Sequence, residues 1–213
     1  MSKKQIFLFL NDLVNNNSKE WMDKNRSRYE ECKSILTEVF DPILDELKSI
    51  DPRIVQPNAR KALNRINNNL MFHPDRPTYK DHFGIGFGYG KGLADFYIHI
   101  GLDEMLIAGG LWHPSNEKLK FLRQEIDYEG KELRLILNNS GFKKHFVLYE
   151  EDKLKSAPKG YSKDHPMIDL LRMKSLAAMR PIAREDFLGE DFRDLVIDSY
   201  KIIAPLLDFA NRA

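Results

Sequence analysis

FGIGFGYGKGLADFYIHIGLDEMLIAGGLW, residues 83–112, is the stretch that decides the fold. It divides into three segments in which bulky apolar residues alternate with glycine or polar residues, a period typical of β-strands. Two-residue turns at residues 90–91 and 102–103 would join these segments into an antiparallel meander. We therefore predict a three-stranded sheet with one face in the hydrophobic core. On that face the first two strands are expected to form the pairs Phe83 with Ile98, Ile85 with Phe96, and Phe87 with Ala94.

The opposite face of the predicted sheet is rich in glycine and carries few polar groups. Glycine weakens a strand and is usually retained where another backbone or a ligand comes close. A bound ligand and a helix of the protein itself both fit this role, and the sequence does not choose between them. The face comprises His82, Gly84, Gly86, Gly88, Asp95, Tyr97, His99, Leu106, Ala108 and Gly110.

The composition is that of an ordinary globular protein. Of the 213 residues, 42% are hydrophobic and 31% are charged, far from the compositions of disordered and membrane proteins. The length suits one domain, and we predict a single domain over residues 1–213. The formal net charge of +1 argues against nucleic-acid binding through a general basic field.

Cysteine content and hydropathy indicate a cytoplasmic protein without membrane association. Cys32 is the only cysteine in the sequence, which excludes a disulfide framework and a cysteine-based zinc site. No stretch approaches the roughly 18 apolar residues that span a bilayer. The first ten residues have the lysines of a signal peptide but only a short apolar run and no cleavage site, so they are interpreted as part of a helix.

The rest of the chain reads as helices with a few further strands, which makes the predicted class α+β. Before the sheet we expect a helix at residues 5–13 and a second one at 18–50, capped by Ser18 and interrupted at residues 41–42. One strand is expected within residues 53–69, and an ordered loop at 71–82. After the sheet we expect two covering helices between residues 114 and 138, a strand at 142–149, a helix capped by Asp164, a strand at 173–179 and a terminal helix from Asp191. The expected architecture is an antiparallel meander sheet covered by helices, with an N-terminal helical pair and a C-terminal helix.

The alternating glycines do not form a phosphate-binding loop of the known type. Gly92 follows Lys91 at the position where such a loop requires Ser or Thr. A strand pattern follows, whereas phosphate loops lead into a helix. We therefore do not assign a nucleotide fold from this motif.

Two histidines are candidates for metal binding. The predicted register places His82 opposite His99, where their rings would meet above the glycine-rich face, with His73 or Asp95 as a third ligand. In that alternative, a metal-dependent enzyme would use His165 as a general acid or base. Two ligands alone do not make a metal site, so a structural or surface role is the favoured interpretation of His82 and His99.

Cationic and aromatic residues suggest an anion site instead. Arginine offers a planar fork to a carboxylate or phosphate, and lysine offers a point charge. If these groups converge they form an anion pocket, and if they do not they form a solvated surface. The cations are Arg65, Lys80, Lys159, Arg172 and Lys174, and the accompanying tyrosines are Tyr79, Tyr97 and Tyr161.

Several motifs together resemble a bacterial family, the domain of unknown function 2461. They are NNNSKEWMDKNRSRY (15–29), DRPTYKDHFG (75–84), AGGLWHP (108–114), PKGYSKDHP (158–166) and LLRMKS (170–175). The resemblance covers almost the whole chain and implies a single conserved domain with no established activity. The family pattern marks the following positions as those most worth testing: Tyr79, Lys80, Gly109, Gly110, Lys159, Gly160, Tyr161, His165, Pro166, Arg172 and Lys174. Residues 68–72 read NNLMF where the family commonly has Arg-Asp-Val-Arg-Phe, so an activity that depends on those charges would be absent here.

The leading hypothesis is a protein that binds a small anionic ligand, such as a phosphorylated metabolite or nucleotide. The ligand would lie between the glycine-rich face and the loops bearing Lys80 and Lys159. The metal-dependent enzyme is one alternative, and a protein-interaction module that uses the glycine-rich face or the terminal helix is another. Cofactor and oligomeric state are left unassigned. The expected ligand-binding residues are Arg65, Tyr79, Lys80, Tyr97, Lys159, Tyr161, His165, Arg172 and Lys174.

Overall fold

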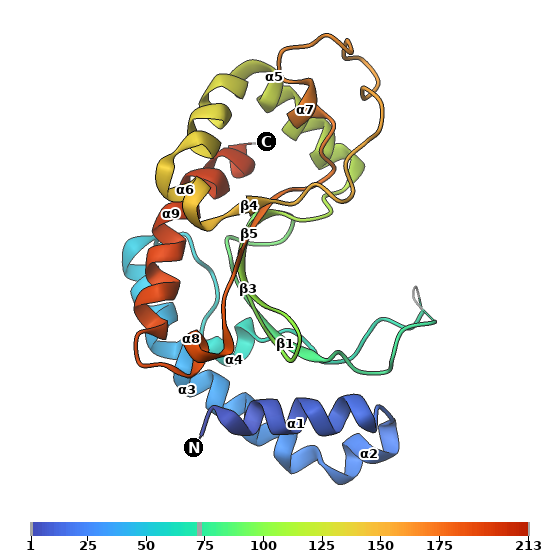
Figure 1. Ribbon diagram of the computed structural model, residues 1–213, viewed down its shortest axis with the longest axis vertical. Coiled ribbons are helices and arrows are strands. Elements are labelled where there is room, and N and C mark those ends of the chain that lie inside the picture. The colour runs from blue at the N-terminus through green and yellow to red at the C-terminus, as the bar shows by residue number, and fades with distance from the viewer. Residues whose placement is uncertain (1, 72–73, 213) are drawn as a thin grey trace. The chain divides into compact units, whose positions relative to one another are not determined.

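The computed structural model describes residues 2–71 and 74–212 and has the predicted α+β class (Figure 1). Its five strands form one antiparallel sheet in the order β1-β2-β3-β5-β4. The meander predicted from residues 83–112 supplies the first three strands, and all three are buried or half-buried along their length. The strands are β1 His82–Gly88, β2 Asp95–Gly101, β3 Met105–Leu111, β4 Val147–Leu148 and β5 Leu176–Pro181.

The connection between β1 and β2 is longer than the predicted two-residue turn. Residues 89–94 lie between the two strands, and the amide of Leu93 donates to the carbonyl of Gly90. Gly92 has φ +77°, a value that glycine adopts without strain. The turn is therefore centred one residue later than expected, on Lys91 and Gly92.

The chain forms two compact units, each described by itself. The first contains the residues up to 87, 97–106 and 181–197, and the second contains 88–96, 107–180 and the residues from 198 on. The prediction of a single domain stays a prediction. No helix in the described part of the chain combines the length and the apolar character needed to cross a membrane.

Helices of the first unit begin with the predicted N-terminal pair. The side chain of Ser18 accepts a hydrogen bond from the amide of Trp21, as expected of a helix cap. The predicted interruption of the helix at residues 41–42 is wrong, because the helical segment is interrupted at Asn25 instead. The helix that follows continues through Pro42, since the buried residues on either side, Phe40 and Ile43, lie on one apolar stripe. The helices are α1 Lys4–Asn15, α2 Lys19–Lys24, α3 Arg26–Ile50, α4 Ala59–Ala62 and α8 Arg184–Leu188.

Aromatic rings form the core of the first unit. Phe83 of β1 stacks on Tyr29 of α3 with 6.0 Å between ring centroids, and Phe9 of α1 lies 6.2 Å from Phe83. Phe40 of α3 packs against Phe87 at the other end of the strand. In Figure 1, α1 runs beside α3. The apolar face of β1 is thus covered by the N-terminal helices. The same region buries Cys32, and burial followed by the charge of Glu31 raises the pKa of its thiol to about 12.

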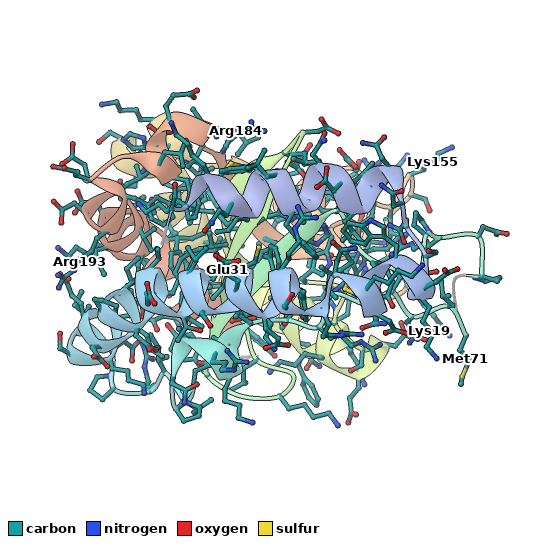
Figure 2. All side chains as sticks on the ribbon, turned by 90° about the horizontal axis from the view of Figure 1, so that it is seen from below. Lys19, Glu31, Met71, Lys155, Arg184 and Arg193 are labelled. Atoms are coloured by element: carbon teal, nitrogen blue, oxygen red, sulfur yellow. The ribbon has the colours of Figure 1, made fainter. Side chains whose placement is uncertain are left out.

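Residues 53–69 form no regular strand, contrary to expectation. They contain α4 and then pair through isolated bridges, Leu63 with Ile85 and Asn67 with Tyr79. The polar run between the two bridges interrupts the ladder. The side chain of Met71 is 84% exposed and extends from the end of this segment (Figure 2).

The second unit contains the helices that follow the sheet. The two helices expected between residues 114 and 138 form one element, α5 Asn116–Asn138, with a kink at Glu129. The strand predicted at 142–149 is largely wrong, because α6 Ser140–His145 occupies its first half and β4 has only two residues. Asp164 does not cap a helix, since α7 Ile168–Leu171 begins later. The strand expected at 173–179 appears as β5.

The terminal helix, α9 Phe192–Arg212, includes Pro205 without an interruption. In the second unit its apolar side packs on β2 and β3. Tyr200 meets Phe96 edge to face at 5.2 Å, and the space above Gly109 is filled by Ile203 and Leu207. A larger residue at position 109 would collide with this helix.

Candidate functional site

The segment that carries Tyr79 and Lys80 is held from three sides within the first unit. The side-chain amide of Asn17 donates to the carbonyl of Tyr79 at 2.9 Å and its oxygen accepts from the Tyr79 amide at 2.8 Å. The Lys80 amide donates to the carbonyl of Ile66 at 2.8 Å, and the Asn68 amide to that of Thr78 at 3.0 Å. These bonds position the residues that lead into β1, although the segment has no regular secondary structure.

A pocket of about 300 Å³ lies against this segment, and we call it the Lys80 pocket. Its lining combines the apolar side chains of Val14 and Pro77 with cations, an imidazole and amides. Its lining residues are Val14, Asn17, Asn68, Arg76, Pro77, Tyr79, Lys80, Asp81 and His82.

Lys80 is the half-buried cation of this pocket. Its ammonium group donates to the carbonyl of Arg65 at 3.0 Å. Burial lowers the pKa of Lys80, and the positive charges of Arg65 and Arg76 lower it further. The positive charges of Arg65 and Arg76 therefore both act against the charged form of Lys80.

Two histidine rings stack beside these cations. His82, at the start of β1, and His99 of β2 lie with ring centroids 3.9 Å apart and planes inclined by 28°. This contact confirms the expectation that the two rings meet. Nδ1 of His82 lies 2.8 Å from the Asp81 carboxylate, which orients the ring.

Burial favours the neutral form of both imidazoles. It lowers the pKa of His82 in spite of the Asp81 carboxylate, which acts in the opposite direction. It lowers the pKa of His99 to about 4, and the neighbouring His82 adds to that effect. The hydrogen bond from His82 lowers the pKa of Asp81, although burial of the carboxyl group opposes this shift.

In each unit, a side chain of the neighbouring strand covers a glycine of β1. In the first unit the hydroxyl of Tyr97 comes within 2.5 Å of the position that a Cβ of Gly84 would take. In the second unit the Asp95 carboxylate comes within 2.7 Å of the same position at Gly88. Neither a helix nor a ligand is needed to explain the absence of side chains at these two positions.

A metal site finds no support among the described residues. Nowhere in residues 2–71 and 74–212 do three His, Cys, Asp or Glu side chains converge on a position for an ion. His73, one candidate third ligand, lies outside the described residues. The other candidate, Asp95, belongs to the second unit, where burial raises its pKa to about 6 and its Oδ1 atom is buried without a hydrogen-bond partner.

The structure divides the expected ligand-binding residues between the two units. Arg65, Tyr79, Lys80 and Tyr97 lie in the first unit, and the rest in the second. A pocket formed by both sets stays a prediction. The residues in the second unit are Lys159, Tyr161, His165, Arg172 and Lys174.

In the second unit, His165 and Arg172 make contacts that support the local structure. His165 accepts the Met167 amide at Nδ1, and its Nε2 lies 2.9 Å from the Asp127 carboxylate. Arg172 donates through Nε to the carbonyl of Leu154, whose amide donates back to the Arg172 carbonyl at 2.9 Å. Both side chains thereby anchor the long connection between β4 and β5.

The other three residues of this set are Tyr161, which is half-buried, and two lysines. Tyr161 lies edge to face with the His165 ring at 6.0 Å, and its pKa is raised by burial and by the Asp127 carboxylate. Lys159 and Lys174 are exposed. Their part in ligand binding stays a prediction.

Sequence reasoning missed three residues that line the Lys80 pocket, namely Arg76, Asp81 and Asn17. Arg76 stood in a proline-containing loop and looked like one of many surface charges. Asp81 directly precedes His82, and this spacing of a carboxylate and an imidazole was a usable signal for an oriented histidine. Asn17 gave no signal, because its bonds to Tyr79 join residues far apart in the sequence.

The comparisons with known proteins give a family but no function. The family model described as "Conserved hypothetical protein (DUF2461)" matches residues 5–209. The comparison with curated proteins found no match, and neither did the comparison with solved structures.

Proposed function

Because this chain belongs to the DUF2461 family, whose description assigns no activity, its function has to be argued from its own geometry, and we propose that it binds a small anion in the Lys80 pocket. The ligand class is a phosphate group or a small phosphorylated metabolite or nucleotide. Lys80 and Arg76 contact the anion in this proposal, and Arg65 adds to the local positive potential.

The observation that carries the proposal is the gathering of like charges. Lys80 sits where burial and two arginines disfavour its charged form. Such an arrangement costs folding free energy. Its presence is explained if the protein needs these charges for binding. An anion in the pocket would favour the charged lysine and offset the repulsion, and charge-assisted bonds of this kind are the strong ones.

The pocket also provides polar groups that could orient such an anion. Its volume of about 300 Å³ suits a small molecule. Lys80 uses one N–H on the Arg65 carbonyl, so the other hydrogens of its ammonium group remain for a ligand. The amide side chain of Asn68 reaches the same pocket.

Thermal unfolding of the full chain in phosphate, sulfate and nucleotides tests the proposal. At a ligand concentration of a hundred times Kd, the free energy of unfolding rises by about 2.7 kcal/mol. Lys80→Ala should lose most of this gain. Lys4→Ala, an exposed lysine outside the pocket, should keep it.

The comparison between the two variants separates specific binding from general salt effects. Phosphate and sulfate stabilise many proteins because they are excluded from protein surfaces, and that contribution should be equal in Lys80→Ala and Lys4→Ala. Equal shifts in both variants, or no shift in the native chain beyond that given by chloride at matched ionic strength, would refute the proposal.

A further inference from the structure

We propose that His82 is a nucleophile that accepts a phosphoryl group. A phosphorylated ligand bound in the Lys80 pocket would transfer this group to the Nε2 atom of His82. This inference rests on the proposed anion binding and deepens it, because it names the chemistry that follows binding. Histidine is one of the side chains that form covalent intermediates in enzymes.

The geometry leaves one nitrogen of His82 available. Nδ1 faces the Asp81 carboxylate at 2.8 Å, which places the proton on Nδ1 and the lone pair on Nε2. Nε2 has no hydrogen-bond partner among the described residues. The ring lines the Lys80 pocket and its side chain keeps 22% of its surface exposed.

The stacked partner holds the nucleophile in place. The His99 ring stacks on the His82 ring, with 3.9 Å between the centroids and 28° between the planes. This contact restricts rotation of the His82 ring. His99 itself does not line the pocket, and its Nδ1 atom faces the Tyr97 hydroxyl at 3.4 Å. The structure therefore distinguishes the two histidines, and His82 is the one that reaches a ligand.

The charges around the ring suit a phosphoryl acceptor. Burial and the nearby Lys80 favour the neutral form of His82, while the Asp81 and Glu104 carboxylates favour the charged form. Burial is the largest of these influences, so the ring carries a lone pair at neutral pH. The charge of Lys80 reaches the His82 ring, and Arg76 lines the same pocket. In the proposed reaction these two cations neutralise phosphoryl oxygens, which is the main requirement in phosphoryl transfer.

An acyl phosphate provides a balanced reaction. The Nε2 lone pair attacks phosphorus, the N–P bond forms, and the bond between phosphorus and the bridging oxygen breaks. The electron pair leaves on the carboxylate product, which needs no proton. The phosphorylated imidazole keeps its Nδ1 proton against Asp81, and this carboxylate stabilises the positive charge that develops on the ring.

Incubation of the full-length protein with acetyl phosphate tests the inference. Intact-mass measurement should show one added phosphoryl group that is lost in acid and retained in alkali, and peptide mapping of the native chain should place it on His82. His82→Gln should abolish the label, whereas His145→Gln should keep it. Asp81→Asn should slow labelling at least tenfold and change its pH profile, because the carboxylate sets the tautomer.

The outcomes separate this inference from the proposed function. A thermal shift with phosphate but no label on His82 overturns the inference and leaves anion binding intact. A label spread over several histidines or on lysines also overturns it, because a built site labels one residue. Absence of both the thermal shift and the label refutes both proposals.

Discussion

At the scale of single residues, the stacked histidines link protonation to stability. The folded-state pKa of His99 is lowered to about 4 from its ordinary value of 6.5, with burial as the main cause. The unfolded chain therefore binds more protons than the folded chain between these values. The contribution to stability is fully present above pH 6.5 and is lost as the pH falls toward 4.

We expect His99→Phe to flatten this pH dependence. Phenylalanine keeps a ring to stack on His82 but cannot be protonated, so the free energy of unfolding should fall less between pH 6.5 and 4 than in the native chain. Urea unfolding at several pH values, followed by circular dichroism, measures this. Tyr128→Phe, a change at an exposed tyrosine of the second unit, should retain the native slope. An unchanged slope in His99→Phe would contradict the assignment.

Gly110 is the glycine whose replacement should cost most. Its φ is +137°, and a Cβ would lie 2.1 Å from the carbonyl oxygen of Leu176 on β5. Gly110→Ala should lower the free energy of unfolding by about 3 kcal/mol or more, since backbone strain and a backbone clash add. Gly92→Ala is the matched control, because position 92 also has positive φ but open space around it. The control should lose only about 1 to 2 kcal/mol, the cost of the left-handed conformation. Equal losses in urea titrations of the two variants would show that the clash does not matter.

At the scale of elements, the cap at the start of α2 contributes measurably to the free energy of unfolding. Ser18 Oγ accepts the Trp21 amide at 3.2 Å. Ser18→Ala should lower the free energy of unfolding by about 1 kcal/mol because that amide loses its acceptor. Ser49→Ala, near the other end of the same helical pair and exposed, should change it by less than about 0.5 kcal/mol. Chemical unfolding compares the two, and a loss at Ser49 as large as that at Ser18 would contradict the capping assignment.

The sequence predicted elements well where one periodicity dominated. Strict alternation in residues 83–112 predicted the three strands, and the apolar stripe after Asp191 predicted α9. It failed at α6, where the side chain of Asn139 accepts the amides of Gly141 and Phe142 and starts a helix. The rings of Phe142 and Phe146 stack at 5.6 Å, a spacing of four residues that was misinterpreted as part of a strand.

The candidate site was predictable only in part, for a related reason. Lys80 and His82 stood out as residue types next to a recognisable sheet. Their partners did not, because Asn17 comes from a helix end and Arg76 from an irregular loop. Nothing in the periodicity of a sequence reports which distant loop residues converge, and such convergence is what makes a pocket.

At the scale of the whole molecule, the two units share continuous elements. Residues 95–96 of β2 belong to the second unit and 97–101 to the first, and α9 is divided in the same way at residue 197. Loss of order in one unit should therefore propagate into the other along the strand and the helix that run through both. We therefore expect the chain to unfold in one cooperative step.

The two tryptophans provide the test of this cooperativity. Trp21 lies in the first unit and Trp112 in the second, so Trp112→Phe and Trp21→Phe each leave one fluorescent reporter. The urea midpoints seen by the two reporters should shift together when a common destabilising change such as Ser18→Ala is added to both. A shift seen by the Trp21 reporter alone would show that the units unfold independently.

Cys32 has a practical consequence for work on this protein. Its thiol is nearly inaccessible and stays protonated over the usual working range, since its pKa is about 12. Maleimide dyes attack thiolates, so they should leave the native residue untouched. A cysteine introduced at an exposed position of either unit can then be the only residue that carries a dye. Energy-transfer distances from a tryptophan to that dye become measurable without first removing the natural thiol.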